Sequence, residues 1–254
     1  TAQHRQMLDQ VLEIFDIKPD YDLDIMKNRQ TLIGITTRVL EGLDEVIKQA
    51  KPDIILVHGD TSTSFVGALA GFYNRVPVGH VEAGLRTYDI YSPYPEEMNR
   101  QLTGRIACMH FAPTMRNRQN LLKENVDDEN IFITGNTVID ALKTTVREDY
   151  KFADETLNGI DFDNRRVIIV TAHRRENLGE PLENICNAIK TVMEKYEDTE
   201  VVYPVHLNPA VRETVFAILG GMERVHLIDP IDVCELHNAM ARSFMVMTDS
   251  GGIQ

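Results

Sequence analysis

The sequence predicts an α/β protein with two lobes, each built around a parallel β-sheet. Short apolar runs alternate with amphipathic helical patterns through both halves of the chain. The run IILV at residues 54–57 has no polar interruption, which is typical of a strand covered by helices on both faces. Between the halves, residues 148–166 turn polar and charged, as a linker does. We therefore predict a lobe at residues 1–150, a linker at 151–165 and a second lobe at 166–254, with a cleft between the lobes.

In the first half, the elements follow from apolar spacing and from helix-breaking residues. Apolar side chains recur at helical spacing in two segments before the first strand. The second strand, in VPVGHVE, ends at Glu82, and the helix after YSPYP begins at Glu96. The other predicted elements are helices at 6–15, 31–50, 65–73, 115–124 and up to about 147, strands at 54–57 and 131–133, and a strand end at 111–114.

The second half repeats the alternation of strand and helix. Its first two strands end next to His173 and His206, and its last strand ends at Asp249. In open α/β sheets, ligands bind beyond the carboxyl ends of the strands, so these positions are candidates for a site. The predicted elements are strands at 167–170, 201–205, 225–228 and 244–247, and helices at 181–196 and 233–241.

Composition excludes several classes of protein. The net charge of -13, with 26 basic and 39 acidic residues, argues against a nucleic-acid-binding surface. Cys108, Cys186 and Cys234 are far apart and lack metal-ligand spacing, which favours reduced thiols in a cytoplasmic protein. No apolar run approaches the roughly 20 residues that span a bilayer. Because the chain starts at Thr1 and stops where a helix should begin, we interpret it as a piece of a longer protein.

Three acidic positions follow strands or begin a helix in the first half. Asp60 could simply cap the following helix, and Glu82 could be a buried acid paired with Arg86. Glu96 and its neighbour Glu97 follow a proline, so favourable interaction with the helix dipole would explain them. The case for function rests on their expected convergence at one rim, where carboxylates can take up and return protons.

The second half offers candidates for phosphate binding. His173 begins the segment HRREN, which is either a charged loop or a histidine for acid/base or phosphate contact beside Arg174. His206 occupies the equivalent place after the next strand. The turn Ser250-Gly251-Gly252 offers backbone N–H groups and a hydroxyl to a phosphate, although any tight turn can use these residues.

Other chemistries are poorly supported by the sequence. His58-x-Asp60 and His80-x-Glu82 could supply metal ligands, but the partner motifs of a binuclear phosphoesterase are absent. We therefore expect no metal. No strand is followed by a G-x-G-x-x-G fingerprint for a dinucleotide, and no nucleophilic triad stands out.

Eight segments, in order and with comparable spacing, resemble the non-hydrolysing bacterial UDP-N-acetylglucosamine 2-epimerases. They are TAQHRQMLDQ, VHGDTSTS, GHVEAGLRT, YSPYPEEMNR, FITGNTVID, TAHRREN, YPVHLNP and TDSGGIQ. The resemblance implies two Rossmann-like, doubly wound lobes of the GT-B type, with the nucleotide sugar in the cleft between them. It also implies reversible conversion of UDP-GlcNAc to UDP-ManNAc, for cell-envelope polysaccharide synthesis, by elimination of UDP to 2-acetamidoglucal and re-addition. No cofactor is implied.

The resemblance assigns roles to individual residues. It implies that Asp60, Glu82 and Glu96 are catalytic carboxylates and that His173 contacts the diphosphate and aids departure of UDP. The residues that it implies for substrate binding are Ser250, Gly251, Gly252, Ile231 and Leu236, the last two through backbone contacts to uracil. Some members also bind UDP-GlcNAc as an activator at a second position, which here implies Gln3, Gln6, Arg29, Glu96, Arg174 and His206.

The resemblance leaves rival functions open. It suggests a cytoplasmic homodimer that binds neither nucleic acid nor membrane. A GT-B glycosyltransferase would share the fold and the nucleotide site, but it would need an acceptor pocket and not three acids around one sugar. The motifs are also compatible with a hydrolysing epimerase, which releases free ManNAc and UDP, and with a non-catalytic nucleotide-sugar sensor. The motifs alone do not show which carboxylate is the base in which half-reaction.

Overall fold

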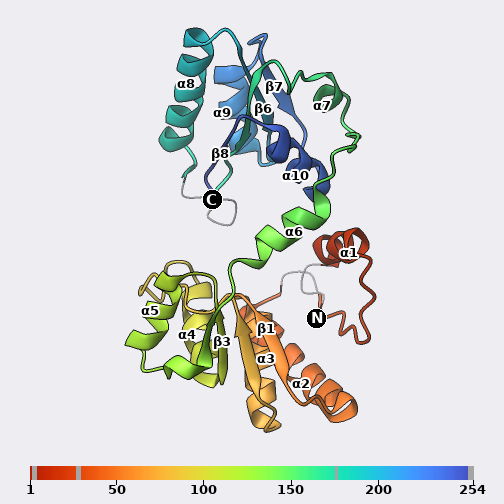
Figure 1. Ribbon diagram of the computed structural model, residues 1–254, viewed down its shortest axis with the longest axis vertical. Coiled ribbons are helices and arrows are strands. Elements are labelled where there is room, and N and C mark those ends of the chain that lie inside the picture. Colours follow the sequence, from red (N-terminus) through yellow and green to blue (C-terminus); the bar gives the residue numbers. More distant parts are fainter. Residues whose placement is uncertain (2–4, 27–29, 175–176, 251–254) are drawn as a thin grey trace. The chain divides into compact units, whose positions relative to one another are not determined.

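The computed structural model describes residues 1, 5–26, 30–174 and 177–250. The chain forms two compact units, residues 1–140 and 141–254. Each unit contains one four-stranded parallel sheet with helices packed on it, as Figure 1 shows. The prediction of two parallel α/β lobes is confirmed. Within the described residues, no helix has the length and apolar character needed to cross a membrane.

The first unit has a sheet in the order β1-β2-β3-β4, with all neighbouring strands parallel. The strands are β1 (Ile55–His58), β2 (Val78–Val81), β3 (Met109–Ala112) and β4 (Ile131–Ile133). The helices are α1 (Arg5–Ile14), α2 (Leu32–Ala50), α3 (Ser62–Tyr73), α4 (Glu96–Ile106) and α5 (Met115–Lys123), with a 3-10 turn η1 (Asp128–Asn130) before β4. The helix α6 (Thr137–Thr145) contains the boundary between the two units. Because the strands run in one direction, the residues that follow β1 and β2 emerge at the same edge of the sheet.

Threonine side chains begin three helices of this unit. The hydroxyl oxygens of Thr31, Thr61 and Thr114 each accept a hydrogen bond from a backbone N–H three residues further on, which satisfies a donor that the helix cannot. The apolar stripe of α2 that the spacing predicts is buried at Ile35 and Val39. The caps determine where these three helices begin. The apolar stripe determines which face of α2 is buried.

The second unit has a sheet in the order β7-β6-β5-β8, again parallel throughout. The strands are β5 (Arg166–Thr171), β6 (Thr199–Pro204), β7 (Val225–Ile228) and β8 (Met245–Thr248). The helices are α7 (Glu155–Gly159), α8 (Glu180–Lys195), α9 (Pro209–Leu219) and α10 (Val233–Arg242). From β5 the chain adds strands first on one side and then, at β8, on the other. Such a reversal of strand order opens a crevice at the strand ends, where α/β proteins bind ligands.

The two faces of the second sheet are covered by different helices. Ile168 and Val170 of β5 belong to a core cluster with α8 and α9. Val167 and Ile169, which point to the opposite face, belong to a second cluster with α7 and α10. Burial on both faces explains why β5 is an unbroken apolar run in the sequence.

The segment predicted as a linker at residues 151–165 packs against the second sheet instead. Phe152 and Leu157 are buried in the cluster with α10, and Phe152 stacks on Phe162 with ring centroids 6.0 Å apart. The Glu235 carboxylate of α10 accepts hydrogen bonds from the backbone N–H groups of Ala153 and Asp154. The boundary between the compact units lies at 140/141, before the predicted position. Apolar residues are spaced among the charged ones in this segment, and their side chains are buried on one side of it. A prediction from average polarity does not detect this pattern.

A second difference is the helix α9, which the sequence analysis did not predict. Its first turn begins at Pro209, and the Asn208 side chain accepts a hydrogen bond from the Ala210 N–H. Val211 and Val215 are buried against the second sheet. The sequence carries the usual signals, an N-cap asparagine followed by proline and a 3.6-residue apolar repeat, so this helix was predictable.

Gly84 lies in the loop after β2, where the backbone packs closely against α5. Its φ of 85° is in the left-handed region, and an added Cβ would overlap the Asn117 carbonyl oxygen. We expect Gly84→Ala to lower the free energy of unfolding by roughly 3 kcal/mol, from backbone strain and the steric clash together. Gly135 is the matched control, because its φ is 80° with no neighbouring atom within 4 Å. Gly135→Ala should cost only about 1 kcal/mol. Equal losses in urea unfolding would contradict the clash.

Candidate functional site

Asp60, the first predicted acid, lies in the turn after β1 and is held by Arg100 of α4. The Asp60 Oδ2 atom accepts hydrogen bonds from Arg100 Nε at 3.0 Å and Nη2 at 2.7 Å. The Asp60 carbonyl oxygen accepts a further bond from Asn99 Nδ2 at 2.9 Å. The α3 cap is Thr61, so helix capping does not explain Asp60. An aspartate fixed at both its backbone and its carboxylate, yet with 30% of its side chain exposed, can meet a ligand in one defined orientation.

Glu97, the neighbour of the predicted Glu96, is fully buried and anchors this arrangement. Its two oxygens accept hydrogen bonds from the backbone N–H groups of Thr87 and Tyr88, both at 3.1 Å. They also accept from Gln101 Nε2 at 3.0 Å and from Arg100 Nη1 at 3.2 Å. Burial disfavours the charged carboxylate, but these four donors outweigh burial, and the pKa of Glu97 is lower than its usual value. Glu97 therefore holds both Arg100 and the loop before α4.

Glu96 stands in the first turn of α4 and is half-buried. Its carboxylate has no hydrogen-bond or ion-pair partner among the described residues, in contrast to the four donors around Glu97. Helix-dipole interaction alone would apply equally to both acids. Their different surroundings separate a structural glutamate from one that remains available to a ligand.

Glu82 follows β2 in a left-handed backbone conformation, with φ of 66°. This conformation costs a non-glycine residue about 1 kcal/mol or more, and such strain clusters at functional sites. Its Oε2 atom lies 3.8 Å from Nε2 of His58. Arg86, the partner considered from the sequence, instead makes a bidentate ion pair with Glu124 at 2.7 and 2.9 Å. Glu82 is therefore not explained as the partner of Arg86.

The carboxylate of Glu82 lies directly over Gly59, next to Asp60 in the chain. A Cβ at Gly59 would be 3.2 Å from Glu82 Oε2, and Gly59 has a φ of 71°. The Nε2 atom of the buried His80 is 2.8 Å from the Gly59 carbonyl oxygen, so this nitrogen carries the hydrogen. Burial lowers the pKa of His80 to about 4, which keeps the ring neutral. The glycine turn thus brings the acids that follow β1 and β2 to the same edge of the sheet.

In the second unit, His173 and His206 follow the neighbouring strands β5 and β6. Their rings stack with centroids 5.3 Å apart and an angle of 9° between the planes. Both side chains are exposed, and His206 Nδ1 accepts a hydrogen bond from the Asn208 N–H at 3.0 Å. The sequence motifs imply separate roles for these two histidines, whereas their rings are in direct contact in the structure.

Asp249, which sequence reasoning treated only as a strand end, binds the loop that carries His173. Its Oδ2 atom accepts hydrogen bonds from the N–H groups of His173 and Arg174, at 3.0 and 2.9 Å. Asn177 Nδ2 donates to the same oxygen at 3.0 Å. Although burial acts against the charged form, these donors lower the pKa of Asp249. Asp249 stands beside β5 at the reversal of strand order.

The remaining predicted binding residues fall into two groups. Ser250 follows Asp249, and its N–H donates to Thr248 Oγ1 at 2.9 Å. Ile231 and Leu236 are half-buried against the core cluster of α7 and α10. Gly251, Gly252, Gln3 and Arg29 lie outside the described residues, as does the side chain of Gln6, which belongs to α1. Arg174 is exposed beside His173. The predicted roles of all these residues remain predictions.

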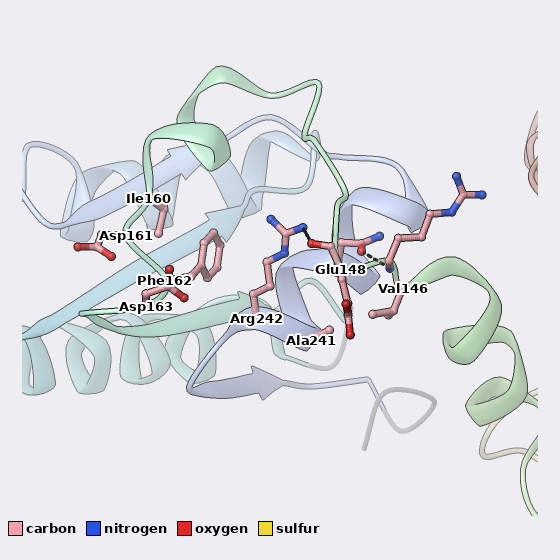
Figure 2. A pocket seen from close by; sticks show the side chains of 10 residues that line it. Val146, Glu148, Ile160, Asp161, Phe162, Asp163, Ala241 and Arg242 are labelled. Carbon is pink, nitrogen blue, oxygen red and sulfur yellow. Dashed lines mark hydrogen bonds between the residues drawn. The ribbon is translucent and has the colours of Figure 1, made fainter.

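A pocket in the second unit lies beside the segment predicted as a linker (Figure 2). Arg242 Nη2 donates there to the carbonyl oxygens of Glu148 and Tyr150, at 3.4 and 2.7 Å. Its guanidinium carbon is also 5.0 Å from the centre of the Phe152 ring. The described residues that line the pocket include no residue predicted for the site. Arg242 here holds the chain to α10, and we assign this pocket no catalytic role.

The sequence prediction did not place Arg100 or Asp249 in the site, and it named Glu97 only as the neighbour of Glu96. A helical signal for Arg100 was present, because residues three and four apart share a helix face and Arg100 follows Glu96 and Glu97 at these distances. Asp249 had only its place after a strand as a signal. Its contacts with residues more than 70 positions earlier depend on strand order, which the sequence does not state.

Two parallel α/β units, each with polar residues gathered after its strand ends, define a two-lobed protein of the GT-B type. The sequence profile of the family described as UDP-N-acetylglucosamine 2-epimerase matches residues 1–254. The chain belongs to this family.

Individual relatives agree with this assignment. The chain is 59% identical to the UDP-N-acetylglucosamine 2-epimerase of Bacillus subtilis, over 100% of this chain and 66% of that protein. It is similar to the crystal structure of UDP-GlcNAc 2-epimerase from Neisseria meningitidis bound to UDP-GlcNAc, with a TM-score of 0.86, 48% identity and coverage of 100% and 69% of the two chains. A co-structure of S. aureus MnaA with UDP gives a TM-score of 0.84 at 49% identity, over 96% and 64% of the chains. The chain thus spans about two thirds of the length of its relatives.

The contacts of Glu97 predict a pH-dependent stability. Glu97→Gln should lower the free energy of unfolding by about 2 kcal/mol at neutral pH, because a buried acceptor of four hydrogen bonds is lost. Because the folded-state pKa is below the usual 4.5, this stabilisation is complete above about pH 4.5 and is lost as the pH falls through the folded pKa.

Urea unfolding of both proteins from about pH 7 to pH 3 measures this effect. The difference between wild type and Glu97→Gln should shrink toward the acid end. Glu96→Gln is the matched control and should stay within about 0.5 kcal/mol of wild type, since its side chain has no partner in the described chain. A difference for Glu97→Gln that is independent of pH would contradict the charged hydrogen-bond network.

Proposed function

We propose that the protein catalyses the reversible C2 epimerisation of UDP-GlcNAc to UDP-ManNAc. The observation that carries this proposal is the pair of acids after β1 and β2, Asp60 and Glu82, in a chain whose family is the UDP-N-acetylglucosamine 2-epimerases. Asp60 is bound by Arg100, whereas Glu82 has a left-handed backbone and its Oε2 atom lies 3.8 Å from Nε2 of His58. Two carboxylates in such different surroundings suit different steps of proton transfer.

The reaction proposed here needs a leaving group as well as a base. The proton on C2 of the sugar is weakly acidic, so inversion at C2 is easier once the anomeric C–O bond breaks. Loss of UDP together with the C2 proton gives 2-acetamidoglucal. Addition of UDP to this alkene, with a proton delivered to the opposite face of C2, gives the epimer. Asp60, Glu82 and Glu96 are the proposed acids and bases of these steps.

The second unit is proposed to bind the UDP portion. Departure of UDP develops negative charge on the diphosphate, which hydrogen-bond donors and cations near His173, Arg174 and Ser250 can stabilise. These residues emerge from β5 and β8, the two strands that flank the reversal of strand order. Ile231 and Leu236, whose half-buried side chains pack against the second core cluster, are proposed to contact uracil through their backbone. No metal or organic cofactor enters this scheme.

Regulation and assembly are further parts of the proposal. Six positions match the activator site implied by the resemblance, so UDP-GlcNAc would activate its own conversion and that of UDP-ManNAc. The homodimer and the cytoplasmic location are proposed on the same resemblance. The described Cys108, Cys186 and Cys234 are free thiols, as a reducing compartment would keep them. Dependence of UDP-ManNAc turnover on added UDP-GlcNAc tests the activation.

Incubation of the protein with UDP-GlcNAc in D2O, without an acceptor, tests the proposed reaction. Proton NMR should show UDP-ManNAc that carries deuterium at C2, because the proton removed from C2 exchanges with solvent. Free ManNAc and UDP as final products would point to a hydrolysing epimerase instead. Binding of UDP-GlcNAc without exchange at C2 would favour a glycosyltransferase or a non-catalytic sensor.

Substitution of the two acids tests their role directly. Asp60→Asn and Glu82→Gln should each reduce kcat about 100-fold or more, as loss of a general acid or base commonly does. Asp53→Asn is the matched control, because Asp53 is an exposed acid at the amino end of the same strand region and should keep wild-type kcat. Steady-state rates with unfolding curves for each variant provide the comparison. Wild-type kcat in either acid variant would refute its catalytic role.

A further inference from the structure

The Asp249 carboxylate joins two loops that leave neighbouring strands of the second sheet. Its backbone N–H donates to the Thr171 carbonyl oxygen at 3.1 Å, which continues the pairing of β5 with β8. Its Oδ2 atom accepts three hydrogen bonds from residues 173, 174 and 177. Ser250 follows immediately in the chain. The side chain of Asp249 therefore connects the loop of His173 and Arg174 with the end of β8, next to Ser250.

The local charges do not suit a direct contact between Asp249 and a phosphate. Both groups are negative, so their approach is repulsive. The N–H groups of His173 and Arg174, which could otherwise donate to a phosphate, already donate to Asp249. Asp249 Oδ1 is buried and has no hydrogen-bond partner among the described residues. Burial of the Oδ1 atom without a hydrogen-bond partner costs free energy of folding. We therefore look for a role of Asp249 other than direct binding of a phosphate.

Tyr203 and His206 make further contacts with the segment that carries His173. The hydroxyl of the buried Tyr203 donates to the Ala172 carbonyl oxygen at 2.6 Å. The His206 ring stacks on the His173 ring. Tyr203 therefore binds the residue before His173, Asp249 binds the backbone N–H groups of His173 and Arg174, and His206 stacks on the His173 ring. These three contacts act on the same short segment after β5.

We propose that Asp249 is a positioning residue, which fixes the loop of His173 and Arg174 relative to Ser250 so that these three residues bind one diphosphate. The inference rests on the proposed function, because it requires that these residues bind UDP. Asp249 acts through hydrogen bonds to the loop and makes no contact with the reacting atoms. Precise placement of the three residues matters most when charge develops on the leaving diphosphate.

Comparison of wild type with Asp249→Asn, which has the same shape without the charge, tests this role. In the ligand-free protein, amide hydrogen exchange at His173 and Arg174 should speed up about tenfold, as expected when charge-assisted hydrogen bonds weaken. With UDP-GlcNAc, kcat should fall at least about tenfold, while KM changes less, since positioning counts most in the transition state. Removal of a negative charge near an anion site would by itself have the opposite effect and tighten UDP binding.

Two further variants keep the test decisive. Asp229→Asn is the matched control, because Asp229 is an exposed acid after β7 in the same sheet and pairs with Arg212; it should match wild type in exchange, kcat and UDP affinity. Asn177→Ala removes one donor and leaves Asp249 in place, so it should cause a smaller loss of kcat in the same direction. It also serves if Asp249→Asn fails to fold.

The outcomes separate this inference from the proposed function. Tighter UDP binding with unchanged kcat in Asp249→Asn, or a wild-type kcat in both variants, overturns the positioning role. A wild-type protein that binds no UDP overturns the proposed function and this inference with it. Faster amide exchange combined with lower kcat supports the inference.

Discussion

The first unit depends on one guanidinium shared between two carboxylates. Arg100 bridges Glu97, which is fully buried, and Asp60, which is partly exposed. A buried carboxylate is costly unless it is fully hydrogen-bonded, and Glu97 meets this condition with four donors. Because Glu97 is fixed, Arg100 is fixed, and the carboxylate of Asp60 is fixed in turn. The structural acid Glu97 thus determines, through Arg100, where the carboxylate of the candidate catalytic acid Asp60 lies.

Carboxylates also fix loops at three places in the chain. Glu97, Glu235 and Asp249 each accept hydrogen bonds from the backbone N–H groups of two consecutive residues in a loop that precedes them in the chain. Such bonds to a charged acceptor are stronger than bonds between neutral groups, and they satisfy N–H donors that no helix or sheet pairs. A loop held in this way can present side chains rigidly without regular secondary structure. The first of these loops precedes α4 beside the candidate acids of the first unit, the second carries His173 and Arg174 of the second unit, and the third, after Tyr150, packs in the second core cluster of that unit.

Much of the fold was readable from local pattern, and the site was readable only in part. Uninterrupted apolar runs such as residues 54–57 indicate parallel strands, and Asp60 and Glu82 were identified because they end such runs. The partnership of Glu97 with Arg100, and that of Asp249 with His173, depends on which strands and helices become neighbours. Residues 148–166 were predicted as a polar linker from composition, whereas Phe152 and Leu157 are buried in a cluster with α10, which begins only at Val233. The average polarity of a segment is a property of that segment alone, whereas the burial of its side chains depends on which other elements pack against it.

Cleavage and re-formation of the anomeric C–O bond is the central claim of the proposed mechanism. The most direct measurement uses UDP-GlcNAc with 18O in the bridge between C1 and the β-phosphorus, incubated with the protein. If UDP departs and returns, the label should move into the non-bridging positions of the β-phosphate in recovered UDP-GlcNAc and in UDP-ManNAc, and 31P NMR detects this through the isotope shift. If UDP-ManNAc forms while all the label stays in the bridge, the bond never broke, and the elimination mechanism is contradicted.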